Sequence, residues 1–444
     1  MDLFTSGLGF LIVICAALYY YTRTVTSKVN DQNFSRFQRV YLIVYLLAMM
    51  GDWLQGPHVY ALYESYNMDK HQIEILFIAG FGSSLFFGTI VGSFADKYGR
   101  RFNCILYGVL YGIGCITKHF NNFHILMFGR LMAGIATSIL YSAFESWLIY
   151  EHKQRGFEES SLGTIFANAY LGNSVVAIMS GIIAQLVANT FGYVAPFDTS
   201  LLVLVCMVAL IFANWSENFG DSQAHIKQSF ISALHAIKTD KKVLLLGLIQ
   251  SLFEGSMYVF VLEWTPALTV ESNANKQDSS NPPIPHGYIF AAYMVAVMIG
   301  SNLFKILSKY QDCEEFMRGV LAASAVSLAV PFLFPGNQFL IFFAFIVFEV
   351  CVGIFWPSMG TMRGRYVPET ARSTIMNFFR IPLNLLVVVI LLNDLSLSLI
   401  FKFCVGFLLT ACLCQFLLNR LVTAIKNTKP TIDALITQVN DNNL

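Results

Sequence analysis

Apolar residues recur along the 444-residue chain in runs long enough to cross a bilayer. A membrane-spanning helix needs about 20 mostly apolar residues, and runs of that length must be helical because backbone polar groups cannot stay unpaired in lipid. One run extends from Leu3 to Tyr21, and further runs follow it at roughly 41–61, 73–94, 102–117, 124–148, 163–188, 197–214, 243–267, 288–308, 316–334, 338–361, 373–392 and 397–420. We therefore predict an all-α polytopic membrane protein.

The most polar interior stretch, residues 215–242, separates the twelve later runs into two sets of six. Apolar residues recur within it at helical spacing, which predicts an amphipathic helix on the membrane surface. The predicted organisation is an extra transmembrane helix and a cytoplasmic linker (1–40), a first six-helix bundle (41–214), a cytoplasmic middle loop (215–242), a second six-helix bundle (243–420) and a cytoplasmic tail (421–444).

Composition supports this prediction and narrows the function. Hydrophobic residues make up 56% of the chain and charged residues 12%, against about 25% charged in soluble domains. The net charge of +1 gives no reason to expect nucleic-acid binding. The nine cysteines are scattered, and no metal-ligand cluster, phosphate-binding loop or paired nucleophile and base is recognisable. We expect no enzyme activity, no cofactor and no metal site.

The distribution of lysine and arginine predicts the orientation. The segments at 23–40, 215–242 and 420–444 are basic, whereas the loops on the other side hold only Lys70, Lys118 and Lys276. Positive charge marks the cytoplasmic side, so the N-terminus is expected outside and the C-terminus in the cytoplasm. The first run lacks the preceding basic residues of a cleaved signal peptide, so we expect it to be retained. We also expect a monomer in the cell membrane.

The loop between the second and third of the twelve runs carries the sharpest motif. It reads Gly92-Ser-Phe-Ala-Asp96-Lys-Tyr-Gly99-Arg100-Arg101. Gly92 permits close helix approach and Gly99 a tight turn, while Asp96 lies at a helix end and the arginines can pair with carboxylates across the bundle. We predict a cytoplasmic gate. The pattern resembles the signature loop of the major facilitator superfamily, which implies that fold.

Several ionisable residues lie deep in apolar runs, where a charge is costly and marks a functional site by default. Two carboxylate–guanidinium pairs of similar depth are predicted, one in each half: Asp52 with Arg130, and Glu349 with Arg380. Glu254 is a further deep carboxylate and a candidate for proton coupling with Asp52 and Glu349. Glu145, near the cytoplasmic boundary, is expected to pair with Arg100 or Arg101 as part of the gate. The alternative for the deep pairs is a static structural role.

Arg130 also begins an Arg-x-x-x-Gly sequence ending at Gly134, which resembles a fourth-helix motif of proton-coupled superfamily members. An oxyanion in a low-dielectric cavity needs fixed cations and hydrogen-bond donors, and arginine offers a planar fork of donors. The candidate substrate-binding residues are therefore Arg130 and Arg380, with neutral donors at Asn377, Asn384 and Gln55.

The chain as a whole resembles the molybdate-anion transporter family of the major facilitator superfamily. The resemblance extends over most of the chain, including the extra N-terminal helix, and rests on Gly51–Tyr60, the gate loop, Ala143–Trp147, Ala195–Phe197, Asn214–Asn218, Leu246–Glu254, Glu263–Pro266, Phe355–Ser358 and Phe379–Pro382. It implies uptake of molybdate by secondary transport. The residues themselves leave two alternatives open: a proton-linked carrier of another solute such as sulfate, a sugar or a drug, and a transport-inactive receptor or scaffold.

Overall fold

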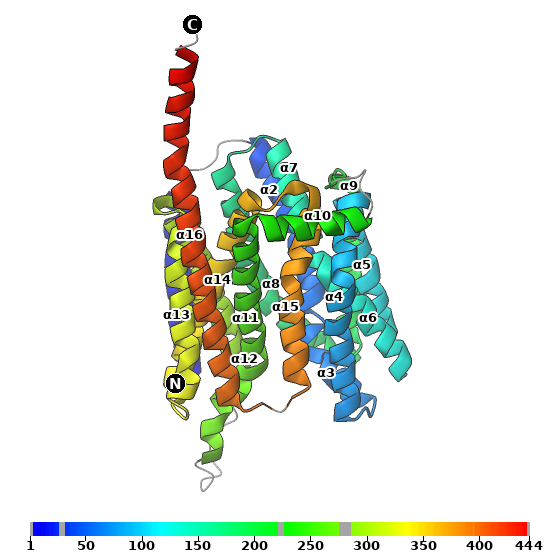
Figure 1. Ribbon diagram of the computed structural model, residues 1–444. Helices are drawn as coiled ribbons and strands as arrows, with labels where there is room; N and C mark the ends of the chain where they lie inside the picture. Colours follow the sequence, from blue (N-terminus) through cyan, green and yellow to red (C-terminus); the bar gives the residue numbers. More distant parts are fainter. Residues whose placement is uncertain (1–2, 26–31, 221–225, 275–285, 394, 442–444) are drawn as a thin grey trace.

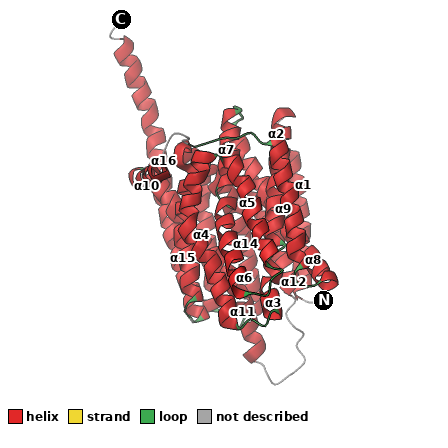
Figure 2. Ribbon diagram, turned by 90° about the vertical axis from the view of Figure 1, so that its right-hand side faces the viewer, coloured by secondary structure: helices red, strands yellow, loops and turns green. Residues whose placement is uncertain are grey.

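The computed structural model describes residues 3–25, 32–220, 226–274, 286–393 and 395–441. Within these residues the chain is helical and contains no strand (Figure 2), as predicted. The first part comprises α1 (Leu3–Val25), α2 (Gln32–Trp53), η1 (Gly56–His58), α3 (Val59–Ser65), α4 (Lys70–Tyr98), α5 (Arg100–Thr117), α6 (Phe123–Leu140), α7 (Ala143–Gln154), α8 (Glu159–Phe191) and α9 (Ala195–Asn214). The second part comprises α10 (Ile226–Thr239), α11 (Lys241–Ala274), α12 (His286–Tyr310), α13 (Cys313–Leu333), α14 (Gln338–Tyr366), η2 (Glu369–Ala371), α15 (Arg372–Leu391) and α16 (Leu397–Asp441).

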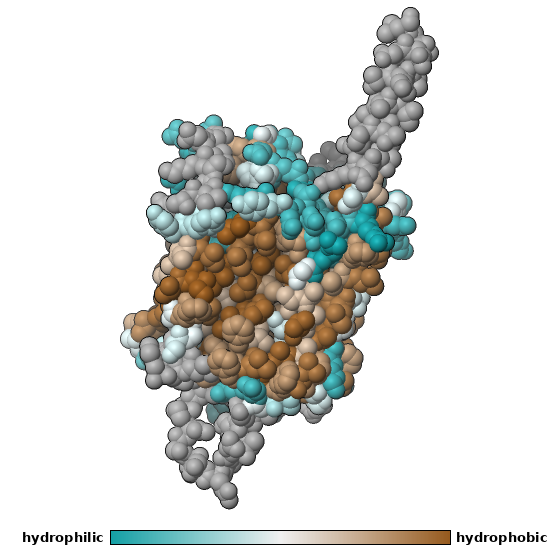
Figure 3. Space-filling model, turned by 90° about the vertical axis from the view of Figure 1, so that its left-hand side faces the viewer, coloured by the Kyte–Doolittle hydropathy of each residue, from teal (hydrophilic) through white to brown (hydrophobic). Residues whose placement is uncertain are grey.

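The long helices form a membrane-spanning bundle with a broad hydrophobic belt between two hydrophilic ends (Figure 3). Among the described residues nine helices are long and apolar enough to cross a membrane, and α4 makes a tenth if its bent halves count as one span. The chain is therefore a multi-pass membrane protein. Three predicted spans, now α1, α2 and α5, fall short of that hydropathy and length, yet they pack beside spans α12, α8 and α6 respectively.

The two ends of the bundle differ, and the gate loop defines them. We call the end that carries Asp96–Arg101 the latch end. The middle-loop helix α10 lies across this end, over α15 and α4, and the C-terminus extends beyond it, whereas the N-terminus lies at the opposite end (Figure 1). The helix predicted in the middle loop is thus present as α10, although residues 221–225 before it lie outside the described part of the chain.

The two halves meet along α4 with α15 and along α8 with α12 and α14. A Cβ at Gly92 of α4 would stand 2.7 Å from the Ser373 carbonyl oxygen and 2.9 Å from the Cα of Thr374. Only glycine lets the two backbones approach this closely, so Gly92 fixes how the gate loop reaches α15. The extra helix α1 packs on the second half, with Phe4 edge-on to Phe342 at 5.0 Å between ring centroids.

One predicted span has different boundaries in the structure. The first predicted span, 41–61, is α2, which begins at Gln32 and ends at Trp53 because Pro57 cannot continue an α-helical hydrogen-bond ladder. The span predicted at 124–148 is present as one candidate span, Phe123–Gln154. It is interrupted between α6 and α7, where the Ser142 hydroxyl bonds back to the Ser138 carbonyl at 2.7 Å, a contact that bends helices. The segment after residue 420 is helical, because α16 continues to Asp441.

Candidate functional site

The latch end is held closed by Asp96, which caps the start of α15. Its carboxylate accepts hydrogen bonds from the backbone N–H groups of Ser373 at 3.3 Å and Thr374 at 3.0 Å, and from the Thr374 hydroxyl at 3.0 Å. The first N–H groups of a helix lack intrahelical partners, and the helix dipole favours an anion there. Asp96 is fully buried, so this cap joins α4 of the first half to α15 of the second.

Arg100 adds a second connection between the halves. Its buried guanidinium pairs with Asp96 at 3.1 Å and with the Glu369 carboxylate, and it donates to the Glu369 carbonyl at 2.9 Å. Arg101 does not reach across the bundle as predicted: its guanidinium donates to the Phe212 carbonyl of α9 at 3.1 Å, within the first half.

The turn at Gly99 is closed by a residue from the middle loop. Gly99 has φ of +113°, and a Cβ there would meet the Glu217 carboxylate carbon at 2.4 Å. Glu217 caps α5 by accepting from the backbone N–H groups of Arg101 at 2.8 Å and Phe102 at 3.0 Å. Burial raises the pKa of Glu217, although these backbone hydrogen bonds oppose the rise. Glycine is thus required by both its backbone conformation and its contact.

For a transporter of the kind that the sequence predicts, Asp96→Asn should impair the transport cycle more than folding. Asparagine is nearly isosteric but brings an N–H₂ group toward donors at the start of α15 and removes the charge that pairs with Arg100. We expect an uptake rate reduced at least about tenfold, equivalent to about 1.4 kcal/mol, at normal surface abundance. Surface-corrected uptake measures this, and a wild-type rate would contradict a gating role for the cap.

Glu145 forms a third inter-half contact, but its partner is not the predicted one. Its carboxylate pairs with Arg363 of α14, with Arg363 Nε and Nη2 donating at 2.7 and 2.6 Å. The prediction that Glu145 pairs with Arg100 or Arg101 was therefore wrong. Charge-assisted bidentate pairs of this kind are the strongest side-chain hydrogen bonds. Arg363 is 2% exposed and Glu145 13% exposed, so the pair is largely buried, and both residues line a small cavity that Arg380 also lines.

On the side of these contacts away from the latch end, a cavity of about 180 Å³ lies between the halves. It brings together residues of α2, α4, α5, α6, α11 and α15: Asp52, Gly80, Phe81, Ser84, Tyr111, Arg130, Ala133, Gly134, Thr137, Tyr141, Tyr258, Arg380 and Asn384. The two arginines selected from the sequence as substrate ligands thus line one cavity, together with Asp52 and Asn384. The break after α6 contributes Tyr141 to its wall.

Arg380 is the most unusual group in this cavity. Its side chain is buried, yet its Nε and Nη1 atoms have no hydrogen-bond partner among the described residues. Its Nη2 lies 3.9 Å from a Glu254 carboxylate oxygen, and its guanidinium carbon lies 4.1 Å from the centroid of the Tyr141 ring. Buried polar groups are normally hydrogen-bonded. Two unpartnered donors on a buried cation make Arg380 a candidate to bind an acceptor.

The predicted deep pairs are not formed. The Asp52 carboxylate accepts a hydrogen bond from Tyr111, and no ion pair within the described residues joins it to Arg130. Arg130 instead donates to the Leu76 carbonyl at 3.2 Å and lies over the Phe77 ring. Arg380 pairs with Glu254, so the predicted Glu349–Arg380 pair was wrong.

Glu349 lies away from the cavities. It is buried on α14 in the core of the second half, near Tyr293, and lines neither of the two cavities between the halves. The sequence predicted Glu349 and Arg380 at one level, because their depths along the helix axes are similar. The orientation of α14 about its axis directs Glu349 away from Arg380.

The three neutral donor candidates are placed differently. Asn384 lines the cavity and donates to the Ser84 hydroxyl at 3.2 Å. Asn377 packs against Gly92 and donates to the Ser373 carbonyl at 3.0 Å, so it belongs to the α4–α15 crossing. Gln55 bonds to Gly51 and Ser200 inside the first half and does not line the cavity. Only Asn384 is positioned to touch a ligand beside Arg130 and Arg380.

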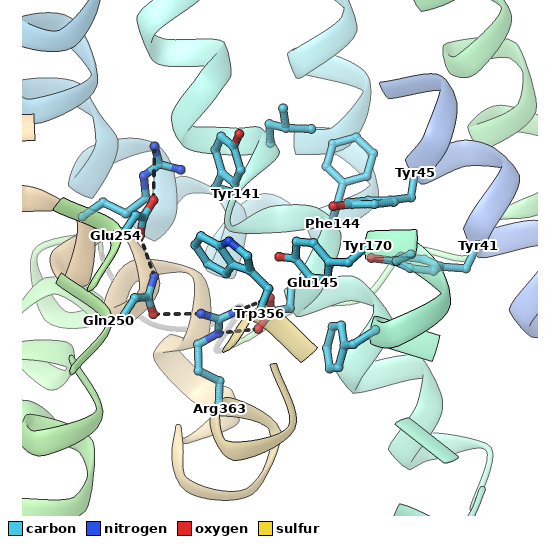
Figure 4. Close-up of a pocket in the computed structure, with 14 residues that line it drawn as sticks. Tyr41, Tyr45, Tyr141, Phe144, Glu145, Tyr170, Gln250, Glu254, Trp356 and Arg363 are labelled. Atoms are coloured by element: carbon cyan, nitrogen blue, oxygen red, sulfur yellow. Dashed lines mark hydrogen bonds and ion pairs between the residues drawn. The ribbon is translucent and has the colours of Figure 1, made fainter. Parts of the chain in front are cut away.

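A smaller cavity of about 30 Å³, roughly the room of one water molecule, lies between Arg380 and the Glu145–Arg363 pair. Figure 4 shows its lining, in which Glu254, Gln250, Arg363 and Glu145 follow one another through hydrogen bonds. Arg380 and Tyr141 line both cavities. Neither Arg363 nor Gln250 was among the candidates predicted from the sequence. Gln250 is uncharged and lies within an apolar run.

The two cavities together hold three guanidiniums and three carboxylates: Arg130, Arg363 and Arg380, with Asp52, Glu145 and Glu254. With every group ionised the formal charges cancel. A dianion bound there would leave an uncompensated charge in low dielectric.

Residues 3–346 match a family described as sugar transporters with twelve transmembrane segments. The chain is also 33% identical to the molybdate-anion transporter of Xenopus tropicalis, over 82% of this chain and 80% of that protein, and 31% identical to that of Danio rerio, over 86% of each. The chain belongs to the molybdate-anion transporter family of the major facilitator superfamily.

Solved structures show the same fold. The chain is similar to a bacterial homologue of the iron transporter ferroportin in an outward-facing state, with a TM-score of 0.69 and 14% identity, over 86% of this chain and 99% of that one. It is also similar to a human organic anion transporter, with a TM-score of 0.66 and 12% identity, over 87% of this chain and 100% of that one. The predicted fold is confirmed, and membership of the family makes this chain a secondary transporter and not an enzyme, as predicted.

Proposed function

We propose that this protein takes up molybdate, a tetrahedral oxyanion, across the cell membrane by alternating access. The similarity to molybdate-anion transporters supports this substrate. The buried Arg380, with two unpartnered donors among the described residues, supports an anion as the ligand. A neutral solute would supply no charge opposite this buried guanidinium, whose ion pair with Glu254 spans 3.9 Å.

The proposed binding position lies between Arg380, Arg130 and Asn384. Each guanidinium presents a fork of N–H donors that suits a tetrahedral oxyanion, and Asn384 supplies a neutral donor from the same helix as Arg380. The guanidinium carbons of Arg380 and Arg130 lie 4.1 and 4.7 Å from the ring centroids of Tyr141 and Phe77. Arg380 keeps its Nε and Nη1 donors without a hydrogen-bond partner among the described residues. The ligand would bridge the two halves.

We propose that a proton accompanies the anion. The site is formally neutral before binding, and Asp52 lies in the cavity without an arginine partner. Protonating Asp52 while the dianion binds would reduce the charge that enters the bundle. Glu254 is the alternative proton acceptor, since it loses its contact with Arg380 if the anion takes that guanidinium.

The described conformation fits one stage of alternating access. The Asp96 cap, the Arg100–Glu369 pair and the Glu145–Arg363 pair close the latch end, while the larger cavity lies on the other side of them. We propose that the latch end faces the cytoplasm, that the protein works as a monomer in the bilayer, and that this state is open toward the outside.

The proposed orientation of the chain in the membrane gives a direct prediction. Gln228 is exposed on α10, so a Gln228→Cys variant should react with a membrane-impermeant thiol reagent only after the cells are permeabilised. An epitope at the N-terminus should bind antibody on intact cells. Labelling of Cys at 228 in intact cells, above the level of the unsubstituted chain, would reverse the proposed topology.

The decisive functional test is uptake by the purified protein in proteoliposomes, with molybdate, sulfate, phosphate and a hexose as competitors and the external pH varied. We expect molybdate uptake that molybdate itself inhibits most strongly and that rises as the external pH falls. Saturable hexose uptake insensitive to oxyanions would favour a neutral-solute carrier. No transport of any of these, with the protein correctly folded, would favour a receptor or scaffold.

A further inference from the structure

A continuous series of polar contacts connects the proposed anion-binding arginine to the inner closure between the halves. Arg380 Nη2 lies 3.9 Å from Glu254 Oε1, and Glu254 Oε2 accepts a hydrogen bond from Gln250 Nε2 at 3.2 Å. Gln250 Oε1 in turn accepts from Arg363 Nη1 at 2.8 Å. Arg363 then donates to the Glu145 carboxylate (Figure 4).

The last contact of the series joins the two halves. Glu145 lies on α7 of the first half, and Arg363 lies on α14 of the second. Removing one member of a buried ion pair leaves an uncompensated charge, which typically costs about 3–5 kcal/mol. Opening the bundle toward the latch end must therefore supply Arg363 and Glu145 with other partners.

Gln250 is the only neutral member of the series and lies between Glu254 and Arg363. Its side chain is 4% exposed, and each end of its amide makes one hydrogen bond of the series. The orientation of that amide is set by both neighbours, because the oxygen must face Arg363 and the N–H₂ must face Glu254. It therefore responds to any change in the charge of Glu254.

We propose that Gln250 is a positioning residue that transmits occupancy of Arg380 to the Glu145–Arg363 closure. This inference rests on the proposed function, in which an oxyanion binds Arg380. When the anion takes that guanidinium, Glu254 loses its nearest cation. Arg363 is then the nearest cation along the series, and Glu254 draws it through Gln250 away from Glu145. The contact between α7 and α14 weakens, and the latch end opens with substrate bound.

The physical requirement for such coupling is a difference in interaction between the two states. A ligand shifts a conformational equilibrium only by its differential affinity for the two conformations. Here the difference arises because Glu254 is compensated by Arg380 in the closed, empty state and by Arg363 in the open, loaded state. Closure without substrate is thereby favoured, which limits a futile cycle.

The first test compares Gln250→Leu with Gln415→Leu in the purified full-length protein. Both glutamines are buried in the second half, but Gln415 Nε2 donates to the Glu314 carbonyl at 2.9 Å, away from the closure. We expect Gln250→Leu to keep the molybdate dissociation constant within about twofold and to slow molybdate exchange in proteoliposomes at least about tenfold. Gln415→Leu should change neither. Equal exchange rates in the two variants, or a parallel loss of binding in Gln250→Leu, would overturn the proposal.

The second test needs no ligand, so it separates this inference from the choice of substrate. A cysteine at Thr361, a buried residue of α14 that faces a pocket at the latch end, reports opening through its rate of reaction with an impermeant thiol reagent. Arg380→Ala frees Glu254 as the anion would, and should raise that rate at least about fivefold. Adding Gln250→Leu should remove most of the increase.

The outcomes of the two tests separate the hypotheses. An increase that persists in the double variant would overturn the role of Gln250, and the absence of any increase with Arg380→Ala would overturn the whole series. Failure of the unsubstituted protein to bind molybdate, with the labelling pattern as expected, would overturn the substrate alone.

Discussion

Arg380→Ala is expected to raise the half-saturating molybdate concentration at least about tenfold, because a hydrogen bond to a charged group contributes about 1.5–3 kcal/mol. The Nε and Nη1 donors of Arg380 have no hydrogen-bond partner among the described residues. Removing them should therefore weaken ligand binding more than it destabilises the fold. Concentration-dependent uptake with surface-corrected expression is the measurement. Arg380→Lys should recover only part of the affinity, since an ammonium lacks the planar fork.

The matched control is Arg318→Ala, an arginine of the same half whose Nε donates to the Glu315 carbonyl far from the cavities. The molybdate affinity of Arg318→Ala should stay at the wild-type level. Arg130→Ala should weaken binding in the same direction as Arg380→Ala, since both guanidiniums line the larger cavity. Wild-type affinity in both cavity variants would show that the arginines are structural and that the anion binds among the neutral donors.

Breaking the Glu145–Arg363 pair is expected to have the largest effect on conformation. Arg363→Ala leaves the Glu145 carboxylate, 13% exposed, without its bidentate partner, at a cost of about 3–5 kcal/mol. The closed state should be lost, seen as faster labelling of a cysteine at Thr361 and a lower melting temperature. The double variant Glu145→Ala/Arg363→Ala should recover part of the melting temperature, because neither charge is then left buried alone.

Another ion pair between the halves, Arg365–Glu159, provides the control for this experiment. Arg365 Nε donates to Glu159 at 2.7 Å, but the Glu159 side chain is 65% exposed. Exposed ion pairs contribute about 0–1 kcal/mol, so Glu159→Ala should leave labelling and melting almost unchanged. If Glu159→Ala and Arg363→Ala changed cysteine labelling and the melting temperature equally, burial would not distinguish the two ion pairs. The inner closure would then lie elsewhere.

The sequence by itself determined the helices, their division into two halves and the location of the gate loop. Each follows from local chemistry. The length of an apolar run predicts a membrane span, and a polar stretch separates the two halves. The gate loop is recognisable because its motif, Gly92–Arg101, is contiguous in the sequence. It also identified which charges lie deep, because depth follows from the number of residues to the nearest helix end. Asp52 and Arg130 were placed at one depth by that reasoning, and the structure brings both to one cavity, together with Arg380.

Only the tertiary structure decided which of these charges are partners. Depth fixes a residue along its helix axis, but the rotation of each helix and the crossing of its neighbours fix the direction of the side chain. Glu349 and Arg380 were assigned to one level, yet Arg380 meets Glu254 instead. Glu145 met Arg363 and not the gate arginines for the same reason.

The neutral residues of the site could not be identified from the sequence for a different reason. Gln250 and Tyr141 lie within apolar runs, where an amide or a phenol carries no charge to signal a cost in lipid. The role of Tyr141 depends on the break between α6 and α7, which directs it to the cavity. The role of Gln250 depends on Arg363, which α14 brings beside it. Such neighbours come from separate helices, and only the packed bundle places them together.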